Sequence, residues 1–186
     1  MKFSLALIVY PIAVLAASIS EARQSALDGP FIARLSGGNV FNKAVNASDG
    51  HFFTNRPTNT YCPGDPVNCS YYNGNETIFY LGAGTTLGLD SHVPGGQRVY
   101  IGPDGALSFT QAHSNYMPPG SIETGFSRQQ GIEGVYLNVA DREWYICVQP
   151  GNDYQVFSLN TTHSNCFEAE IKTYYTPNSG HVWEYV

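Results

Sequence analysis

Short runs of β-forming residues, each bounded by glycine- or proline-rich turn sequences, recur along this chain of 186 residues. After residue 22 no segment keeps apolar residues at the i, i+3, i+4, i+7 spacing of an amphipathic helix. The turn sequences include SGGN, PGG, GPDG, PPG and PGND. This pattern predicts an all-β fold, a single antiparallel β-sandwich or barrel with Greek-key-like connections. We predict strands over residues 30–35, 77–82, 85–90, 97–102, 106–112, 134–140, 143–149, 154–159 and 167–175.

The sequence RVYIGPDGALSFT, residues 98–110, is the clearest predicted hairpin. Apolar residues alternate on both sides of the turn, and Gly105 supplies the tolerance for positive φ that a tight turn needs. A recurring G-x-L-x pattern in GTTLGLD, DGALSFT and EGVYLNV leaves a β-trefoil as the alternative fold.

The N-terminus has the three-part pattern of a secretory signal peptide: Lys2, an apolar run from Phe3 to Ala17, and then small residues. The apolar run is short for a membrane span and Pro11 interrupts it, so we expect no retained membrane anchor. We therefore predict a signal peptide over residues 1–22, cleaved between residues 17 and 22, and one secreted all-β domain over residues 23–186.

Four cysteines in a secreted chain predict two disulfides. Three connectivities are open. We favour Cys62–Cys69 with Cys147–Cys166, because each pair spans a local turn. Neither pair has the C-x₂₋₄-C spacing that zinc sites usually show.

Four N-x-[ST] sequons predict N-glycosylation at Asn46, Asn68, Asn75 and Asn160. Because a glycan must reach solvent, we expect surface loops or strand edges at these positions. Asn68 precedes Cys69, so disulfide formation competes with glycan addition at that sequon.

The formal net charge of −6 gives no basic surface for nucleic acid or an anionic membrane, and we expect neither partner. We expect the protein to be a monomer that needs no cofactor.

The residues with catalytic potential form no recognisable catalytic pattern. The five histidines show no helical metal-ligand spacing, so we expect no metal site. His113 and Ser114 are adjacent and would point to opposite faces of a strand, so they do not form a dyad, and no G-x-S-x-G elbow is present. Carboxylates are scattered over turns. We therefore predict no catalytic residues.

Aromatic residues are abundant, with 13 tyrosines, 10 phenylalanines and 2 tryptophans. Aromatic faces beside polar side chains commonly bind sugars. A possible ligand surface comprises Tyr71, Tyr72, His113 and Tyr116, although tyrosine is also simply a good strand residue.

The order of VNAS (45–48), YCP (61–63), VPGGQ-x-VY (93–100), DGALSFTQAHS (104–114) and PPGS (118–121) resembles the fungal cell wall protein PhiA family. The likeness covers residues 30–126 and weakens after residue 131. It implies a small secreted glycoprotein of the wall of spore-bearing fungal cells that also acts as an IgE-binding antigen. It supplies no catalytic residues.

Three hypotheses follow. The first is a secreted, non-enzymatic glycoprotein of the fungal cell wall that functions in conidiophore, phialide and spore development and contacts wall polysaccharide or wall proteins. The second is a binding module for glycans or small molecules. The third is a secreted hydrolase, for which a cleft with two convergent carboxylates, or a His that meets a Ser beside an oxyanion hole, would be required.

Overall fold

The computed structural model describes residues 29–151, 153–159, 165–177 and 179–186. The predicted signal peptide and the sequon at Asn160 lie outside these residues. Helix within them is limited to two 3₁₀ turns, η1 (Cys69–Tyr71) and η2 (Ala83–Thr85). No helix in these ranges is long and apolar enough to cross a membrane. The all-β fold class predicted from the sequence is confirmed.

Thirteen strands belong to one antiparallel sheet, and β5 (Thr60–Tyr61) pairs separately with β15 (Glu184–Tyr185). The strands of the large sheet are β1 (Phe31–Gly37), β2 (Val40–Ala44), β3 (Asn46–Ser48), β4 (His51–Phe53), β6 (Phe79–Gly82), β7 (Thr86–Leu89), β8 (Gln97–Ile101), β9 (Leu107–Phe109), β10 (Phe126–Gln130), β11 (Val135–Val139), β12 (Glu143–Gln149), β13 (Asp153–Leu159) and β14 (Cys166–Tyr175).

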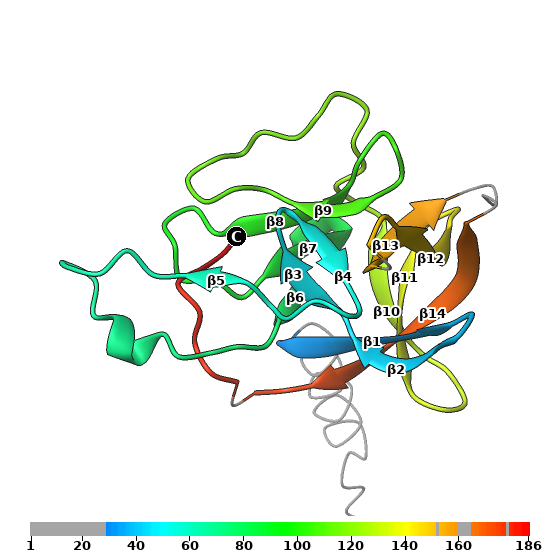
Figure 1. Cartoon of the computed structure of the whole chain (residues 1–186), viewed down its shortest axis with the longest axis horizontal. Helices are drawn as coiled ribbons and strands as arrows, with labels where there is room; N and C mark the ends of the chain where they lie inside the picture. Colours follow the sequence, from blue (N-terminus) through cyan, green and yellow to red (C-terminus); the bar gives the residue numbers. More distant parts are fainter. Residues whose placement is uncertain (1–28, 152, 160–164, 178) are drawn as a thin grey trace, which may run out of the picture.

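The large sheet closes on itself, because β14 pairs with both β12 and β1. Hydrogen-bonded neighbours form the ring β14-β12-β13-β4-β9-β8-β7-β6-β1, which is barrel-like, and the remaining strands attach at its borders. Neighbours far apart in sequence, such as β4 with β9, match the expected Greek-key-like connections. The pairing order has no threefold repeat, so the β-trefoil alternative is set aside. Figure 1 shows the segment with β5 and η1 projecting to one side of the other strands.

A chain of phenylalanine rings fills the core between strands that are distant in sequence. Phe31 stacks on Phe79 with ring centroids 5.7 Å apart, Phe79 lies 5.3 Å from Phe52, and Phe52 lies 5.4 Å from Phe109. All four side chains are buried. Alternation of buried and partly exposed residues along β1 and β8 places their apolar side chains in this core.

The predicted hairpin is confirmed as β8 and β9, with Val99 opposite Phe109 and Ile101 opposite Leu107. Its turn places Gly105 at φ 87°, and the Gly105 amide donates to the Gly102 carbonyl at 2.9 Å.

The sequence did not predict β2, β3, β4, β5, β10 or β15. All six strands are only two to five residues long, and β10 has the polar sequence FSRQQ. Asp49 and Gly50 join β3 to β4 with φ values of 52° and 75°, a pair of positive φ angles that is typical of a tight Asp-Gly hairpin turn.

Candidate functional site

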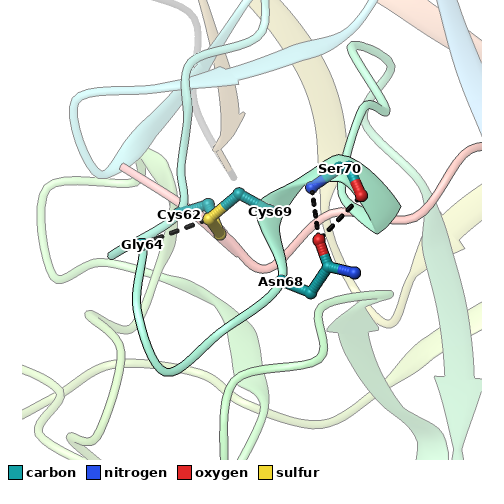
Figure 2. The surroundings of a disulfide bond; sticks show 5 residues. All are labelled: Cys62, Gly64, Asn68, Cys69 and Ser70. Atoms are coloured by element: carbon teal, nitrogen blue, oxygen red, sulfur yellow. Dashed lines mark hydrogen bonds between the residues drawn. A yellow bond between two sulfur atoms is a disulfide. The ribbon is translucent and has the colours of Figure 1, made fainter.

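A disulfide-closed loop presents the pair Tyr71 and Tyr72. Cys62 is joined to Cys69 across seven residues, and Figure 2 shows the Gly64 amide directed at the Cys69 sulfur, 3.3 Å away. At the start of η1 the Asn68 Oδ1 accepts hydrogen bonds from the Ser70 amide at 3.2 Å and the Ser70 hydroxyl at 2.7 Å. The loop therefore has its own covalent and hydrogen-bonded support.

Three chain segments meet beside this loop through backbone hydrogen bonds. The Gly74 amide donates to the His181 carbonyl at 2.9 Å, and the His92 amide donates to the Val182 carbonyl at 3.0 Å. A Cβ atom added at Gly74 would lie 2.7 Å from the Gly180 carbonyl oxygen, so the backbones approach more closely than a larger residue permits. The junction fixes residues 71–74, 91–93 and 180–183 relative to one another.

Five rings gather at this junction, and we call them the aromatic cluster. Tyr71 stacks on His181 with ring centroids 4.3 Å apart and an interplanar angle of 15°. His92 lies 4.9 Å from His181 and 5.4 Å from Tyr72. Trp183 lies 5.3 Å from Tyr72. The members of the aromatic cluster are Tyr71, Tyr72, His92, His181 and Trp183.

The C-terminal segment just before β15 contributes two rings, one on either side of a buried residue. Val182 is buried in the core, while His181 and Trp183 on either side of it are partly exposed. Tyr71 is 51% exposed. The aromatic cluster thus combines a rigid base with accessible ring faces, which is the arrangement that stacking on a flat, partly apolar ligand requires.

The other two predicted ligand residues, His113 and Tyr116, lie on a different loop. Tyr116 is 71% exposed and makes no ring contact with another aromatic side chain in the described ranges. The Ser114 hydroxyl accepts a hydrogen bond from the Tyr116 amide at 3.1 Å, and no hydrogen bond between described residues joins His113 to Ser114. The four residues predicted as one surface are therefore divided between two places.

His113 has a left-handed backbone, with φ 59°. The Ser114 amide donates to the Gln111 carbonyl at 3.2 Å, so His113 is the third residue of a hydrogen-bonded turn. Glycine is favoured at the third position of a turn when φ is positive there. Any other L-residue at that position raises the conformational free energy of the folded state by about 1–2 kcal/mol. Residues with strained backbone conformations are often found at functional sites, so the surroundings of His113 are of interest.

A cavity of about 470 Å³ lies beside that turn, and we call it the His113 cavity. It is bounded by the β3–β4 turn, by the segment after β9 and by the last three residues of the chain. Its lining residues are Asp49, Gly50, Phe109, Gln111, Ala112, His113, Glu184, Tyr185 and Val186. Asp49 and Glu184, two acidic residues from distant segments, thus belong to the lining of one cavity.

Buried hydrogen bonds hold the wall of the His113 cavity in place. The Gln97 side chain accepts from the Tyr185 amide at 2.8 Å and donates to the Tyr185 carbonyl at 2.8 Å. The Tyr185 hydroxyl accepts from the Ile78 amide and donates to the Glu76 carbonyl, both at 3.1 Å. Burial raises the pKa of Tyr185, so this hydroxyl keeps its proton and its donor role.

The structure also places the remaining predicted site residues. Cys147 is joined to Cys166 directly across the β12–β14 pair, so both disulfides follow the pairing that local spacing favoured.

Asn68 and Asn75 are exposed on either side of Tyr71 and Tyr72, whereas Asn46 is half-buried at the start of β3. Among the residues described, no group of three or more His, Cys, Asp or Glu side chains could hold a metal ion.

The fold and its sites define a disulfide-bonded, antiparallel all-β protein with a supported aromatic surface. A family model described as PhiA-like secreted protein matches residues 31–186, and the chain belongs to this family of secreted proteins. The resemblance that the sequence motifs indicated is confirmed.

The chain is also similar to a protein of Arthroderma benhamiae described as an uncharacterized secreted protein. The two are 42% identical over 95 residues, which is 48% of this chain and 43% of the relative, so the chain spans less than half of that relative's length. No solved structure matches the chain.

Proposed function

We propose that this secreted protein is a non-enzymatic component of the fungal cell wall that binds wall polysaccharide through the aromatic cluster. The observation that carries the proposal is the convergence of five rings from three segments on one supported, accessible surface. Sugar rings present flat arrays of C–H bonds, and aromatic faces commonly bind them by stacking.

The chemistry of the aromatic cluster favours a neutral polymer. Its rings carry hydroxyl, imidazole and indole groups that can hydrogen-bond sugar hydroxyls. No Lys or Arg belongs to it, so it offers no fixed cation to an anionic ligand. β-Glucan, chitin and mannan are neutral polymers that fit this description.

The motifs shared with the PhiA family support a role in building the wall of spore-bearing cells, including conidiophore and phialide development and wall integrity. Two exposed sequons and two disulfides fit a stable extracellular glycoprotein, and exposed loops of such a protein suit recognition by IgE.

The proposal is tested by retention on washed, insoluble chitin, β-glucan and mannan. The full chain, made in a secretory host, is compared with Tyr71→Ala and with Tyr116→Ala as the matched control, because both side chains are exposed tyrosines. We expect Tyr71→Ala to lower the affinity for one polymer about fivefold to tenfold, the loss of one stacking contact, and Tyr116→Ala to leave it unchanged.

A second arm repeats the measurement after enzymatic removal of N-glycans, because Asn68 and Asn75 flank the aromatic cluster. Equal retention of both variants, or no retention of any form on the three polymers, would overturn the proposal. Recovery of the native protein only from culture fluid, never from washed walls, would contradict the wall assignment.

A further inference from the structure

The backbone junction beside the aromatic cluster contains a residue pair that can react chemically. Asn73 is followed by Gly74, and none of the other asparagines of the chain precedes a glycine. In such a pair the glycine nitrogen can attack the asparagine side-chain carbonyl carbon, because glycine has no Cβ atom to hinder the approach. Asn73 is exposed, so water can reach its side chain. The pair is therefore the most reactive deamidation sequence in this chain.

The reaction needs no partner except water. The Gly74 nitrogen forms a bond to the Asn73 Cγ atom and loses its proton, the Cγ–Nδ2 bond breaks, and ammonia leaves. Water then opens the resulting succinimide ring at either of its two carbonyl groups. One opening gives aspartate. The other, which is the major one at an asparagine–glycine pair, gives isoaspartate, whose backbone runs through the former side chain and is one carbon atom longer.

In the folded protein the C-terminal segment holds both reacting groups. The Gly74 amide donates a hydrogen bond to the His181 carbonyl at 2.9 Å. The Asn73 Oδ1 atom lies beside Gly180, 3.7 Å from where a Cβ atom of that residue would be. Attack requires the Gly74 nitrogen to turn toward the Asn73 carbonyl carbon, which breaks the hydrogen bond to His181. Asn73 can therefore react only in molecules whose junction has opened locally.

The isoaspartate product does not fit the closed junction. A Cβ atom on Gly74 would lie 2.7 Å from the Gly180 carbonyl oxygen and 2.8 Å from the His181 carbonyl oxygen, so the backbones have no spare room. One inserted carbon atom displaces Gly74 by roughly 1.5 Å, the length of a C–C bond. Because Tyr71 stacks on His181 across this junction, the displacement also separates their rings.

We propose that Asn73 and Gly74 form a latent deamidation site, which the docked residues 180–181 protect and whose conversion to isoaspartate takes the aromatic cluster apart irreversibly. The inference goes beyond the proposed function, because the reaction occurs in the backbone junction whether or not the rings bind polysaccharide. Docking of the C-terminal segment thus sets the chemical lifetime of the aromatic cluster.

Peptide mass spectrometry of the full chain, stored in mildly alkaline buffer, tests the protection. We expect Asn73 to deamidate at least about tenfold more slowly in the folded chain than in the same chain kept unfolded in urea, because only locally opened molecules react. Asn73→Gln is the matched control, since glutamine would have to close a larger ring and should stay unconverted in both states. Equal rates of Asn73 deamidation in the folded and unfolded chain would overturn the proposal.

Gly180→Ala tests whether the junction is the protecting contact. Its methyl group would lie 3.0 Å from the Gly74 Cα atom and 3.4 Å from the Gly74 nitrogen, and Gly180 has no positive φ that would strain alanine. We expect the folded variant to deamidate at Asn73 at least about threefold faster than the natural chain. An unchanged rate in the folded variant would contradict the protection by residues 180–181. If the variant fails to fold, the two states of the natural chain still decide the proposal.

Amide hydrogen exchange of the aged protein tests the consequence. The His92 amide donates to the Val182 carbonyl in the same junction. We expect the isoaspartate form to exchange faster at Gly74 and His92 while β8 and β12 stay slow. Equal exchange in fresh and aged protein would overturn the loss of the aromatic cluster. Retention on wall polymers should fall in parallel with isoaspartate content, and if fresh protein is not retained at all, the proposed function fails while the exchange result still decides this inference.

Discussion

The half-buried histidine His51 makes the stability of this protein depend on pH. His51 lies in β4 with its Nδ1 atom 2.9 Å from the Ser108 hydroxyl of β9. Burial lowers the pKa of His51 below its ordinary value of 6.5, although nearby Asp104 and Asp49 partly oppose the shift. The neutral imidazole is therefore part of the β4–β9 junction.

The first prediction concerns pH. Because the folded pKa of His51 is lowered, the unfolded state binds more protons below about pH 6.5, and stability falls as the pH drops from about 7.5 to 5. We expect the fall in melting temperature over this range to be smaller in His51→Gln than in the natural chain. Identical pH slopes in thermal denaturation of the two proteins would contradict the prediction.

The second prediction concerns glycan occupancy. The Asn46 Nδ2 atom donates to the Arg56 carbonyl at 2.6 Å, and its Oδ1 accepts from the Thr58 hydroxyl at 3.3 Å, whereas Asn75 is exposed. We expect glycopeptide mass spectrometry to find Asn75 occupied and Asn46 free. Asn46→Gln should lower the free energy of unfolding by about 1 kcal/mol, while Asn75→Gln should leave it unchanged. Full occupancy of Asn46 in the folded protein would show the prediction to be wrong.

At the scale of elements, turn chemistry decides which strands the sequence can predict. The residues of β12 were predicted without error, because apolar and aromatic residues fill a long run that ends at Pro150 and Gly151. The strands β10 and β15 were missed, because FSRQQ and EY lack a β-type pattern of their own. β15 exists through tertiary contacts, above all the hydrogen bonds of the buried Gln97 to Tyr185.

The third prediction concerns the turn that joins β8 to β9. This turn also forms a hydrogen bond to a third strand, β13. The Gly105 carbonyl accepts from the Ser158 amide of β13 at 2.8 Å, so a distortion of the turn reaches across the ring. We expect Gly105→Val to lower the free energy of unfolding by about 2 kcal/mol or more, because a β-branched residue is strained at φ 87°.

Gly105→Asn is the matched control for this turn, because asparagine tolerates the left-handed region better than valine does. Urea denaturation should rank the natural chain first, Gly105→Asn second and Gly105→Val last. If both variants unfold at the same urea concentration as the natural chain, the turn does not carry the strain assigned to it.

At the scale of the whole molecule, the sequence indicates which side chains could bind a ligand, but it does not show which of them meet in the folded protein. Tyr71 and Tyr72 stand out as aromatic residues in polar surroundings, but Tyr71 stacks on His181, which lies about 110 positions later in the chain, and His92 meets His181 across about 90 positions. The His113 cavity was missed for the same reason, since its lining residues come from the β3–β4 turn, from the segment after β9 and from the C-terminal segment. Asp49-Gly50 was the available signal for that turn.

The two disulfides act on different parts of this architecture, and this difference gives the last prediction. Cys147–Cys166 joins directly opposed residues of β12 and β14, beside the β14–β1 pairing that closes the ring. Its separation of 19 residues corresponds to about 3 kcal/mol of loop-closure stabilisation. Cys62–Cys69 instead closes the projecting loop that supports Tyr71.

We therefore expect the double substitution Cys147→Ser with Cys166→Ser to lower the free energy of unfolding by about 3 kcal/mol, through loss of the constraint beside the ring closure. Cys62→Ser with Cys69→Ser should instead increase amide hydrogen exchange in η1 and residues 60–75 while exchange in β8, β9 and β12 stays slow. Retention on wall polymer should fall in the second variant even at temperatures where its barrel is intact. Uniformly faster exchange across the barrel in that variant would mean that the projecting loop and the ring unfold as one cooperative unit.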